Sequence, residues 1–209
     1  MAGKKNARLF ALAAFLVFAS TTAVLVARQL NAGPTRPAPA WRTFGPEAAR
    51  IRIYEYTDFA CPACRHAAKA VDEILKVYPA DVRLSFKHYP LTGIHPWSEE
   101  AAAYADCAGE QGRFREYGAL LFEGQEKWGR AKERPAEFEA FARQLGLDWE
   151  KLHSCAVSPE ALKRVRLDSA EGDLKGVNAT PTFFVNGKRA VGAGQLLDLA
   201  KQFDAMLKK

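Results

Sequence analysis

The pattern of apolar and polar residues predicts a β-α-β unit near the start of the folded part of the chain. Residues 50–58 are rich in β-branched and aromatic side chains, as buried strands are. Residues 63–75 have the periodicity of an amphipathic helix, and residues 82–89 alternate between apolar and polar positions until Pro90 ends them. We therefore expect two parallel strands joined by a right-handed crossover helix.

The middle of the chain, from residue 96 to residue 172, has the periodicity of helices throughout. Glycine and proline residues divide it into segments. The expected helices are residues 98–108, 114–123, 135–145, 149–155 and 159–171. Their aromatic residues recur at helical spacing, so we interpret them as core residues. The segment is therefore predicted to be a helical insertion of four to five helices.

After the insertion the pattern returns to strands. Residues 180–185 are again rich in β-branched and aromatic side chains, and Asn186-Gly187 is typical of a tight hairpin turn. The turn leads to a short partner strand over residues 189–191 and then to an amphipathic helix over residues 195–207. The predicted fold class is α/β, with the helical insertion between a β-α-β half and a β-β-α half.

The N-terminus has the pattern of a membrane segment. Residues 9–27 contain no charged side chain and follow Lys4, Lys5 and Arg8. At 1.5 Å per residue the stretch is about 28 Å long, close to the thickness of a bilayer core. We expect residues 1–8 to be a cytoplasmic basic tail and residues 9–27 a transmembrane signal anchor, because a basic flank stays in the cytoplasm. The alternative is a cleavable signal peptide, whose apolar core is usually shorter, about 7–15 residues.

The anchor predicts where the rest of the chain lies. Residues 28–44 contain several prolines and are expected to be a stiff linker that holds the domain away from the membrane. The domain itself is expected over residues 45–209, in the periplasm or another extracytoplasmic space. The protein would then be a single-pass protein of the cell inner (plasma) membrane.

The charge distribution argues against a nucleic-acid-binding domain. The chain has 30 basic and 24 acidic residues, a net charge of +6. Residues 1–40 hold five of the basic residues and no acidic one, which leaves 25 against 24, or +1, for the remainder. The positive charge therefore belongs to the N-terminus, and we expect no nucleic-acid partner.

Four cysteines carry the chemistry that the sequence predicts. Cys61-Pro62-Ala63-Cys64 stands between the first strand and the first helix, with proline at the first helical position. At that position unpaired N–H groups and the helix dipole favour a thiolate at Cys61. A structural zinc site needs about four ligands, and the chain has no second C-x-x-C motif. The motif therefore predicts thiol–disulfide redox chemistry, with no metal and no other cofactor.

The other two cysteines, Cys107 and Cys155, lie within the predicted helical insertion. Because the domain is expected in an oxidising compartment and the number of cysteines is even, we predict a structural disulfide between them. Two free buried thiols are the alternative.

Two motifs together resemble one family. They are Cys61-Pro-Ala-Cys64 after a strand, and residues 176–187, Gly-Val-Asn-Ala-Thr-Pro-Thr-Phe-Phe-Val-Asn-Gly, about 120 residues later. The pair resembles the DsbA-like branch of the thioredoxin-fold superfamily, over about residues 45–207. The resemblance implies a thioredoxin fold with an inserted helical domain at about residues 96–172.

The resemblance also implies roles for individual residues. Cys61 would be the exposed, acidic nucleophile, and Cys64 the buried resolving cysteine. Pro181 would follow a cis peptide bond that brings Thr180 beside the cysteines, where its backbone would pair with an extended substrate. Pro62 and Ala63 would also contact the substrate.

An acid near the cysteines completes the implied site. Glu55, six residues before Cys61, is a candidate proton relay to Cys64, and Asp58 is a weaker candidate for the same role. The dipeptide Pro-Ala departs from the Pro-His of the strongest oxidant in the family. We therefore expect the Cys61 pKa to lie below about 8.5 but above about 3.5. The histidines at 66, 88, 95 and 153 show no partner pattern and receive no role.

The predicted function is that of a membrane-tethered thiol–disulfide oxidoreductase that acts on exported proteins as a disulfide donor. A membrane redox partner would recycle the cysteines. A reductase or isomerase with the same fold is the alternative within this class. A module that binds a soft metal ion is an alternative of a different class, but the only methionines are Met1 and Met206, and no histidine lies inside the motif.

Overall fold

The computed structural model describes residues 21–22 and 35–208. The predicted anchor at 9–27, its signal-peptide alternative and most of the linker lie outside the described residues, apart from Thr21 and Thr22. None of the helices in the described ranges is both long and apolar enough to cross a membrane. The chain divides into a unit of residues 1–36 and a compact unit of residues 37–209, and only the second is considered below.

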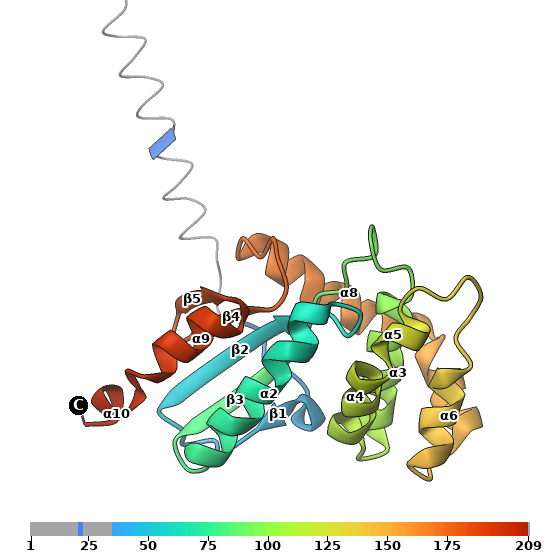
Figure 1. Cartoon of the computed structure of the whole chain (residues 1–209), viewed down its shortest axis with the longest axis horizontal. Helices are drawn as coiled ribbons and strands as arrows, with labels where there is room; N and C mark the ends of the chain where they lie inside the picture. The colour runs from blue at the N-terminus through green and yellow to red at the C-terminus, as the bar shows by residue number, and fades with distance from the viewer. Residues whose placement is uncertain (1–20, 23–34, 209) are drawn as a thin grey trace, which may run out of the picture. The chain divides into compact units, whose positions relative to one another are not determined.

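A five-stranded mixed sheet is the centre of this unit (Figure 1). Its order is β1-β3-β2-β4-β5. The strands are β1 (Thr43–Phe44), β2 (Ile51–Thr57), β3 (Val82–His88), β4 (Thr182–Val185) and β5 (Lys188–Val191). β2 and β3 are parallel, as predicted, and α2 (Pro62–Val77) crosses between them. β4 is antiparallel to β2, and Asn186 adopts the positive φ of 46° that the hairpin to β5 requires.

One face of the sheet packs on α2 and on the C-terminal helices α9 (Gly192–Ala200) and α10 (Phe203–Leu207). Alternation along β2 points Ile51 and Ile53 toward this face, where they meet Val71 and Ile74 of α2. The sequence predicted one helix over residues 195–207. The structure has two helices here, separated by a turn at Lys201 and Gln202. The packing holds α2 against the sheet.

The helical insertion contains six helices within residues 96–176, all of which the structure describes. They are α3 (Ser98–Glu110), α4 (Phe114–Glu123), α5 (Gln125–Trp128), α6 (Glu137–Gln144), α7 (Trp149–Ala156) and α8 (Pro159–Leu174). The prediction of four to five helices missed α5, a single turn that follows Gly124. A helix of four residues is too short to show a periodicity.

The segment before β2 corrects the predicted domain boundary. Residues 37–44, assigned to the linker by the sequence, belong to the compact unit. Thr43 and Phe44 form β1, and Arg42 is buried at 2% exposure. The Arg42 guanidinium forms ion pairs with Asp106 of α3 and Asp168 of α8. These long-range pairs fix the segment, and no local sequence pattern reveals them.

Candidate active site at the Cys61 to Cys64 turn

The turn between β2 and α2 is shaped by hydrogen bonds from Asp58. Its carbonyl accepts from the Cys61 N–H at 3.1 Å, and its carboxylate accepts from the Ala60 N–H at 2.8 Å. Cys61 occupies the N-cap of α2 in an extended conformation, and Pro62 begins the helix. This arrangement aims the first free N–H groups of α2 at the Cys61 sulfur. Pro62 and Ala63, the predicted substrate contacts, are exposed.

Both cysteines are free thiols in this structure. Cys64 is fully buried, and Cys61 is only 8% exposed, so the expectation of an exposed Cys61 is wrong. Its Sγ lies 3.5 Å from the carbonyl oxygen of Thr180, and the Thr180–Pro181 peptide bond is cis. The Thr180 loop therefore covers the sulfur, which the cysteine motif alone does not show.

The two thiols have pKa values that are displaced in opposite directions. A hydrogen bond from Cys64 lowers the pKa of Cys61 to about 5, with further help from the backbone N–H groups of Cys64 and Ala63. Burial raises the pKa of Cys64 well above that of an ordinary thiol, and the Cys61 sulfur raises it further. At neutral pH the pair therefore holds one proton, on Cys64, and Cys61 is a thiolate. The Cys61 value falls within the range expected from the sequence.

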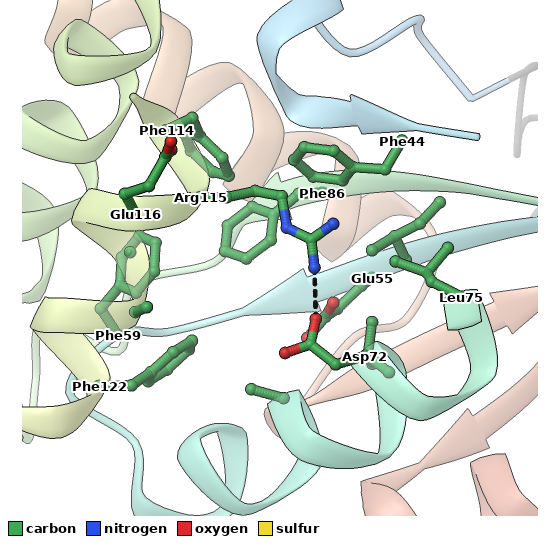
Figure 2. Close-up of a pocket in the computed structure, with 15 residues that line it drawn as sticks. Phe44, Glu55, Phe59, Asp72, Leu75, Phe86, Phe114, Arg115, Glu116 and Phe122 are labelled. Carbon is green, nitrogen blue, oxygen red and sulfur yellow. Dashed lines mark hydrogen bonds and ion pairs between the residues drawn. The ribbon is translucent and has the colours of Figure 1, made fainter. Parts of the chain in front are cut away.

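Glu55 lies under α2 in a pocket with aromatic walls and a volume of about 320 Å³. Figure 2 shows its carboxyl group in this pocket, next to Asp72, which pairs with Arg115 at 2.5 Å. The walls include the rings of Phe44, Phe59, Phe86, Phe114 and Phe122. Burial raises the pKa of Glu55 to about 8; the negative charge of Asp72 also raises it, and the nearby Thr57 hydroxyl opposes the shift. Glu55 is therefore mostly protonated at pH 7.

Thr57 is a site residue that the sequence analysis missed. It follows Glu55 by two positions on the same face of β2, and its hydroxyl lowers the pKa of Cys64 as well as that of Glu55. Thr57 thus lies next to Glu55 and Cys64, the two groups that a proton relay would connect. The alternation of strand β2 was the pattern that could have identified it.

Asp58 and the histidines differ from what the sequence suggested. The Asp58 carboxylate is buried, and besides Ala60 it binds the Leu91 N–H at 2.9 Å and His95 Nδ1 at 2.7 Å. These bonds make it a structural anchor of the turn. The sequence showed no partner pattern for the histidines and assigned them no role. In the structure His95 contacts Asp58, and His153 Nδ1 lies 2.7 Å from the Tyr104 hydroxyl. His66 is exposed on α2, as expected.

The helical insertion also reaches the turn through α5. The Gln125 side chain donates a hydrogen bond of 2.6 Å to the Phe59 carbonyl, and both residues are buried. The Phe59 ring stacks on Phe86 with a centroid separation of 5.3 Å. The Gln125 side chain therefore stabilises the turn from the insertion, in addition to the hydrogen bonds that Asp58 makes within the turn.

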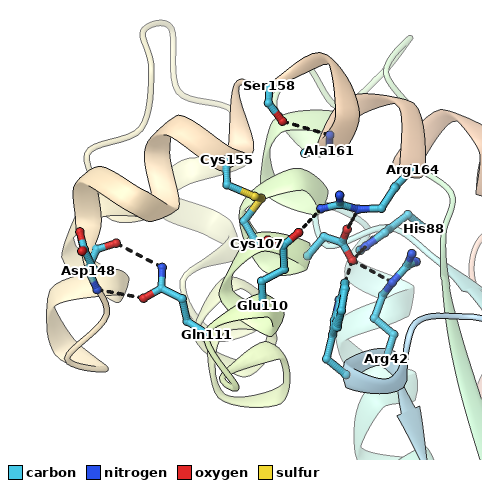
Figure 3. Close-up of a disulfide and its surroundings, with 12 residues drawn as sticks. Arg42, His88, Cys107, Glu110, Gln111, Asp148, Cys155, Ser158, Ala161 and Arg164 are labelled. Atoms are coloured by element: carbon cyan, nitrogen blue, oxygen red, sulfur yellow. Dashed lines mark hydrogen bonds and ion pairs between the residues drawn. A yellow bond between two sulfur atoms is a disulfide. The ribbon is translucent and has the colours of Figure 1, made fainter.

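Cys107 of α3 and Cys155 of α7 form a disulfide with a Cα–Cα distance of 5.9 Å (Figure 3). It joins two helices of the insertion across 48 residues of sequence. Glu110 lies close to both sulfur atoms. A metal would need thiolate ligands, and sulfur atoms bonded to each other do not supply them. The pair is therefore a covalent link within the insertion.

The fold and the turn together define a class of protein. A cysteine pair at the N-terminus of a helix, a cis-proline loop against it and a helical insertion are the features of a DsbA-like thiol–disulfide oxidoreductase. Residues 38–205 match the family model described as thioredoxin. The chain belongs to the thioredoxin family, which confirms the prediction from the two motifs.

Solved structures support the class. A thioredoxin-like oxidoreductase from Silicibacter pomeroyi is 26% identical, with a TM-score of 0.66 and coverage of 80% of this chain and 92% of that chain. DsbA2 of Pseudomonas aeruginosa is 25% identical, with a TM-score of 0.66 and coverage of 80% and 96%. BdbD of Bacillus subtilis is 22% identical, with a TM-score of 0.71 and coverage of 83% and 97%, and shows the same fold.

Curated relatives include longer proteins. Na(+)/H(+) antiporter NhaA 3 of Salinispora tropica is 39% identical over 148 residues, which cover 71% of this chain and 22% of the antiporter. Na(+)/H(+) antiporter NhaA 1 of Salinispora arenicola is 38% identical over 149 residues, with 71% and 22% covered. The chain thus spans about a fifth of the length of these relatives.

The raised pKa of Glu55 predicts a pH-dependent effect on stability. Between about pH 4.5 and about pH 8, Glu55 is protonated in the folded protein and ionised in the unfolded chain. The free energy of unfolding therefore falls by about 1.4 kcal/mol for each pH unit in this range. Glu55→Gln should therefore raise the free energy of unfolding by about 3 kcal/mol at pH 7 and by almost nothing at pH 4. Urea unfolding at both pH values measures this. Glu116→Gln, on an exposed side chain that lines the same pocket, is the control and should change stability by less than about 1 kcal/mol. An equal gain from Glu55→Gln at pH 4 and pH 7 would contradict the assignment.

The Cys107–Cys155 disulfide should contribute stability without taking part in thiol exchange. Replacing both cysteines with alanine should lower the free energy of unfolding by about 4 kcal/mol, the chain-entropy value for a loop of this length. The reduction potential of the Cys61–Cys64 pair should stay the same. Denaturant titration and equilibration with glutathione measure the two effects. Loss of thiol exchange in a variant that remains folded would contradict the separation of the two pairs.

Proposed function

We propose that the protein is a membrane-tethered thiol–disulfide oxidoreductase that donates disulfides to exported proteins through Cys61 and Cys64. The observation that carries the proposal is the opposite displacement of the two pKa values at the N-terminus of α2. A reduced form that is stabilised as a thiolate makes the disulfide form a stronger oxidant. The site therefore favours a disulfide donor over a reductase.

In the proposed reaction a substrate thiolate attacks the Cys61 sulfur of the oxidised pair. The Cys61–Cys64 bond breaks, a mixed disulfide forms, and Cys64 leaves as a thiolate that takes up a proton. A second substrate thiolate then attacks the substrate sulfur of the mixed disulfide and releases Cys61 as a thiolate. Two electrons pass from the substrate dithiol to the cysteine pair, and a membrane redox partner removes them again.

Thr180, Pro181 and Glu55 have supporting roles in this proposal. The Thr180 backbone beside the Cys61 sulfur would pair with an extended substrate chain, next to the exposed Pro62 and Ala63. Backbone pairing gives affinity with little sequence preference, which suits a catalyst with many substrates. Glu55 would supply the proton that Cys64 takes up, because at neutral pH it is a protonated acid under the same helix.

The proposed location rests on the N-terminal sequence. Residues 9–27 would anchor the protein in the inner membrane, with residues 37–209 in the periplasm or another extracytoplasmic space. The Cys107–Cys155 disulfide is consistent with an oxidising compartment. Exported proteins with cysteines are the substrates in this proposal.

The role of Cys61 as the sulfur that forms the mixed disulfide with the substrate has a direct test. Cys64→Ala should accumulate mixed disulfides with exported proteins, because its Cys61 thiolate can still attack a substrate disulfide and no Cys64 thiol remains to displace the substrate in the reverse of the proposed reaction. Cys61→Ala should trap none, since the Cys64 sulfur is fully buried. Non-reducing gels of cell extracts, followed by mass spectrometry of the adducts, detect the trapped species. The reverse pattern, with adducts on Cys61→Ala alone, would refute the assignment.

The direction of electron flow is tested by the reduction potential of the pair. It should lie between about −270 mV, the value of thioredoxin, and about −120 mV, the value of DsbA, in the oxidising half of that range. Equilibration of the purified domain with glutathione buffers gives this potential. A value at or below about −270 mV would make the protein a reductase and overturn the proposed direction.

A further inference from the structure

The loop between β3 and α3, residues 89–97, is attached to the cysteine turn through one buried carboxylate. Asp58 is 2% exposed, and its Oδ2 accepts hydrogen bonds from the Leu91 N–H at 2.9 Å and from His95 at 2.7 Å. Its Oδ1 accepts from the Ala60 N–H at 2.8 Å, within the turn itself. One side chain therefore joins two segments that lie more than 30 residues apart in sequence.

His95 is held in place from the side of the helical insertion. Its carbonyl accepts from the Ser98 hydroxyl at 3.0 Å and from the Ser98 N–H at 3.2 Å, at the start of α3. Its own N–H donates to the Leu91 carbonyl at 2.9 Å. We assign the hydrogen to Nδ1, because the Asp58 carboxylate oxygen that it contacts already accepts from the Leu91 N–H. The imidazole thus connects the segment just before α3 to the cysteine turn.

The backbone of Asp58 contacts both cysteines. Its N–H donates to Cys64 Sγ at 3.4 Å, and its carbonyl accepts from the Cys61 N–H at 3.1 Å. The Asp58 N–H lowers the pKa of the Cys64 thiol, which makes that thiol a stronger hydrogen-bond donor to the Cys61 thiolate, and the disulfide contains no such thiol. Any change that lets Asp58 move therefore alters the balance between the two redox states.

We propose that His95 is a positioning residue for the cysteine pair, which acts by holding Asp58 so that its backbone N–H stays on the Cys64 sulfur. His95 precedes α3 of the insertion and Asp58 follows β2 of the sheet, both labelled in Figure 1, so the contact links the two halves of the domain. The inference rests on the proposed function for its consequence in the cell. Its effect on the thiols does not depend on that function.

The structure gives the sign of the effect. Loss of the Nδ1–H leaves Asp58 with one partner fewer and loosens the N–H contact to Cys64. The Cys64 thiol then donates a weaker hydrogen bond to the Cys61 thiolate, so the reduced pair is less stable relative to the disulfide. The thiolate fraction of Cys61 should fall at a given pH, and the glutathione equilibrium should move toward the protein disulfide.

Two variants separate the hydrogen bond from the volume of the side chain. His95→Phe keeps a ring and loses the N–H, whereas His95→Asn loses the ring and places an amide N–H where Nδ1 lies. The His95 side chain is 16% exposed, so the domain should accept both substitutions. Asp148→Ala is the matched control, since it removes another carboxylate bond to a backbone N–H, from Lys151 at the start of α7, far along the chain from the turn.

Two readouts report on the thiols and not on folding. The rate of Cys61 alkylation as a function of pH gives the thiolate midpoint of the reduced protein. Equilibration with glutathione gives the redox constant. His95→Phe should move the alkylation midpoint up by about half a pH unit to one pH unit and the redox constant about threefold to tenfold toward the disulfide, the effect of one hydrogen bond. His95→Asn should stay within about twofold of the wild type, and Asp148→Ala should leave both readouts unchanged while it lowers the melting temperature.

The outcomes distinguish the inference from the proposed function. If His95→Phe keeps the wild-type alkylation midpoint, or if His95→Asn shifts as far as His95→Phe does, the positioning role is refuted. If the wild type exchanges no disulfide with glutathione, the proposed function fails, and the alkylation midpoint still decides the role of His95. An unchanged redox constant in His95→Phe beside an active wild type refutes the inference alone.

Discussion

The hydrogen bond between Cys64 and the Cys61 sulfur is the interaction on which the rest of the site depends. It leaves one proton for two sulfurs, and because burial keeps that proton on Cys64, the pKa of Cys61 falls to about 5. The bond exists because α2 begins at Pro62, directly after the turn, and places Cys64 one helical turn inside. The other contacts of the turn, from Asp58 and from Gln125, keep the two sulfurs in this relation.

The buried acidic side chains on the two faces of the sheet have opposite surroundings. On the face away from α2, Lys87 lies 3.2 Å from both Asp168 and Glu171, and Arg42 pairs with Asp168. Burial alone would raise the pKa of Asp168, but the charges of Arg42 and Lys87 hold it below its usual value. These paired charges join the insertion to the sheet. On the other face, Glu55 has apolar walls and an acidic neighbour, so it keeps its proton.

The sequence predicted those parts of the molecule whose cause is local. The strand before Cys61, the proline that starts α2 and the hairpin at Asn186-Gly187 each follow from the conformational preferences of a few adjacent residues. The family and the insertion followed from two motifs and their separation. What the sequence missed depends on partners far along the chain: the burial of Cys61 under Thr180, and the attachment of residues 37–44 through Arg42. Contacts of that kind become visible only when the fold brings the segments together.

The acidity of Cys61 does not depend on the side chains of the dipeptide between the cysteines. Pro62 and Ala63 offer no side chain that can donate a hydrogen bond, and an imidazole at that position is absent from the sequence. The groups that lower the pKa are instead the Cys64 thiol, the Thr180 hydroxyl and the backbone N–H groups at the start of α2. Backbone groups act over a short distance and only in one direction, so their effect is lost when the turn shifts by a fraction of an ångström. A thiolate stabilised in this way therefore needs a rigid turn, and that requirement explains why the buried Asp58 carboxylate and the Gln125 side chain of α5 both bind the backbone of the turn.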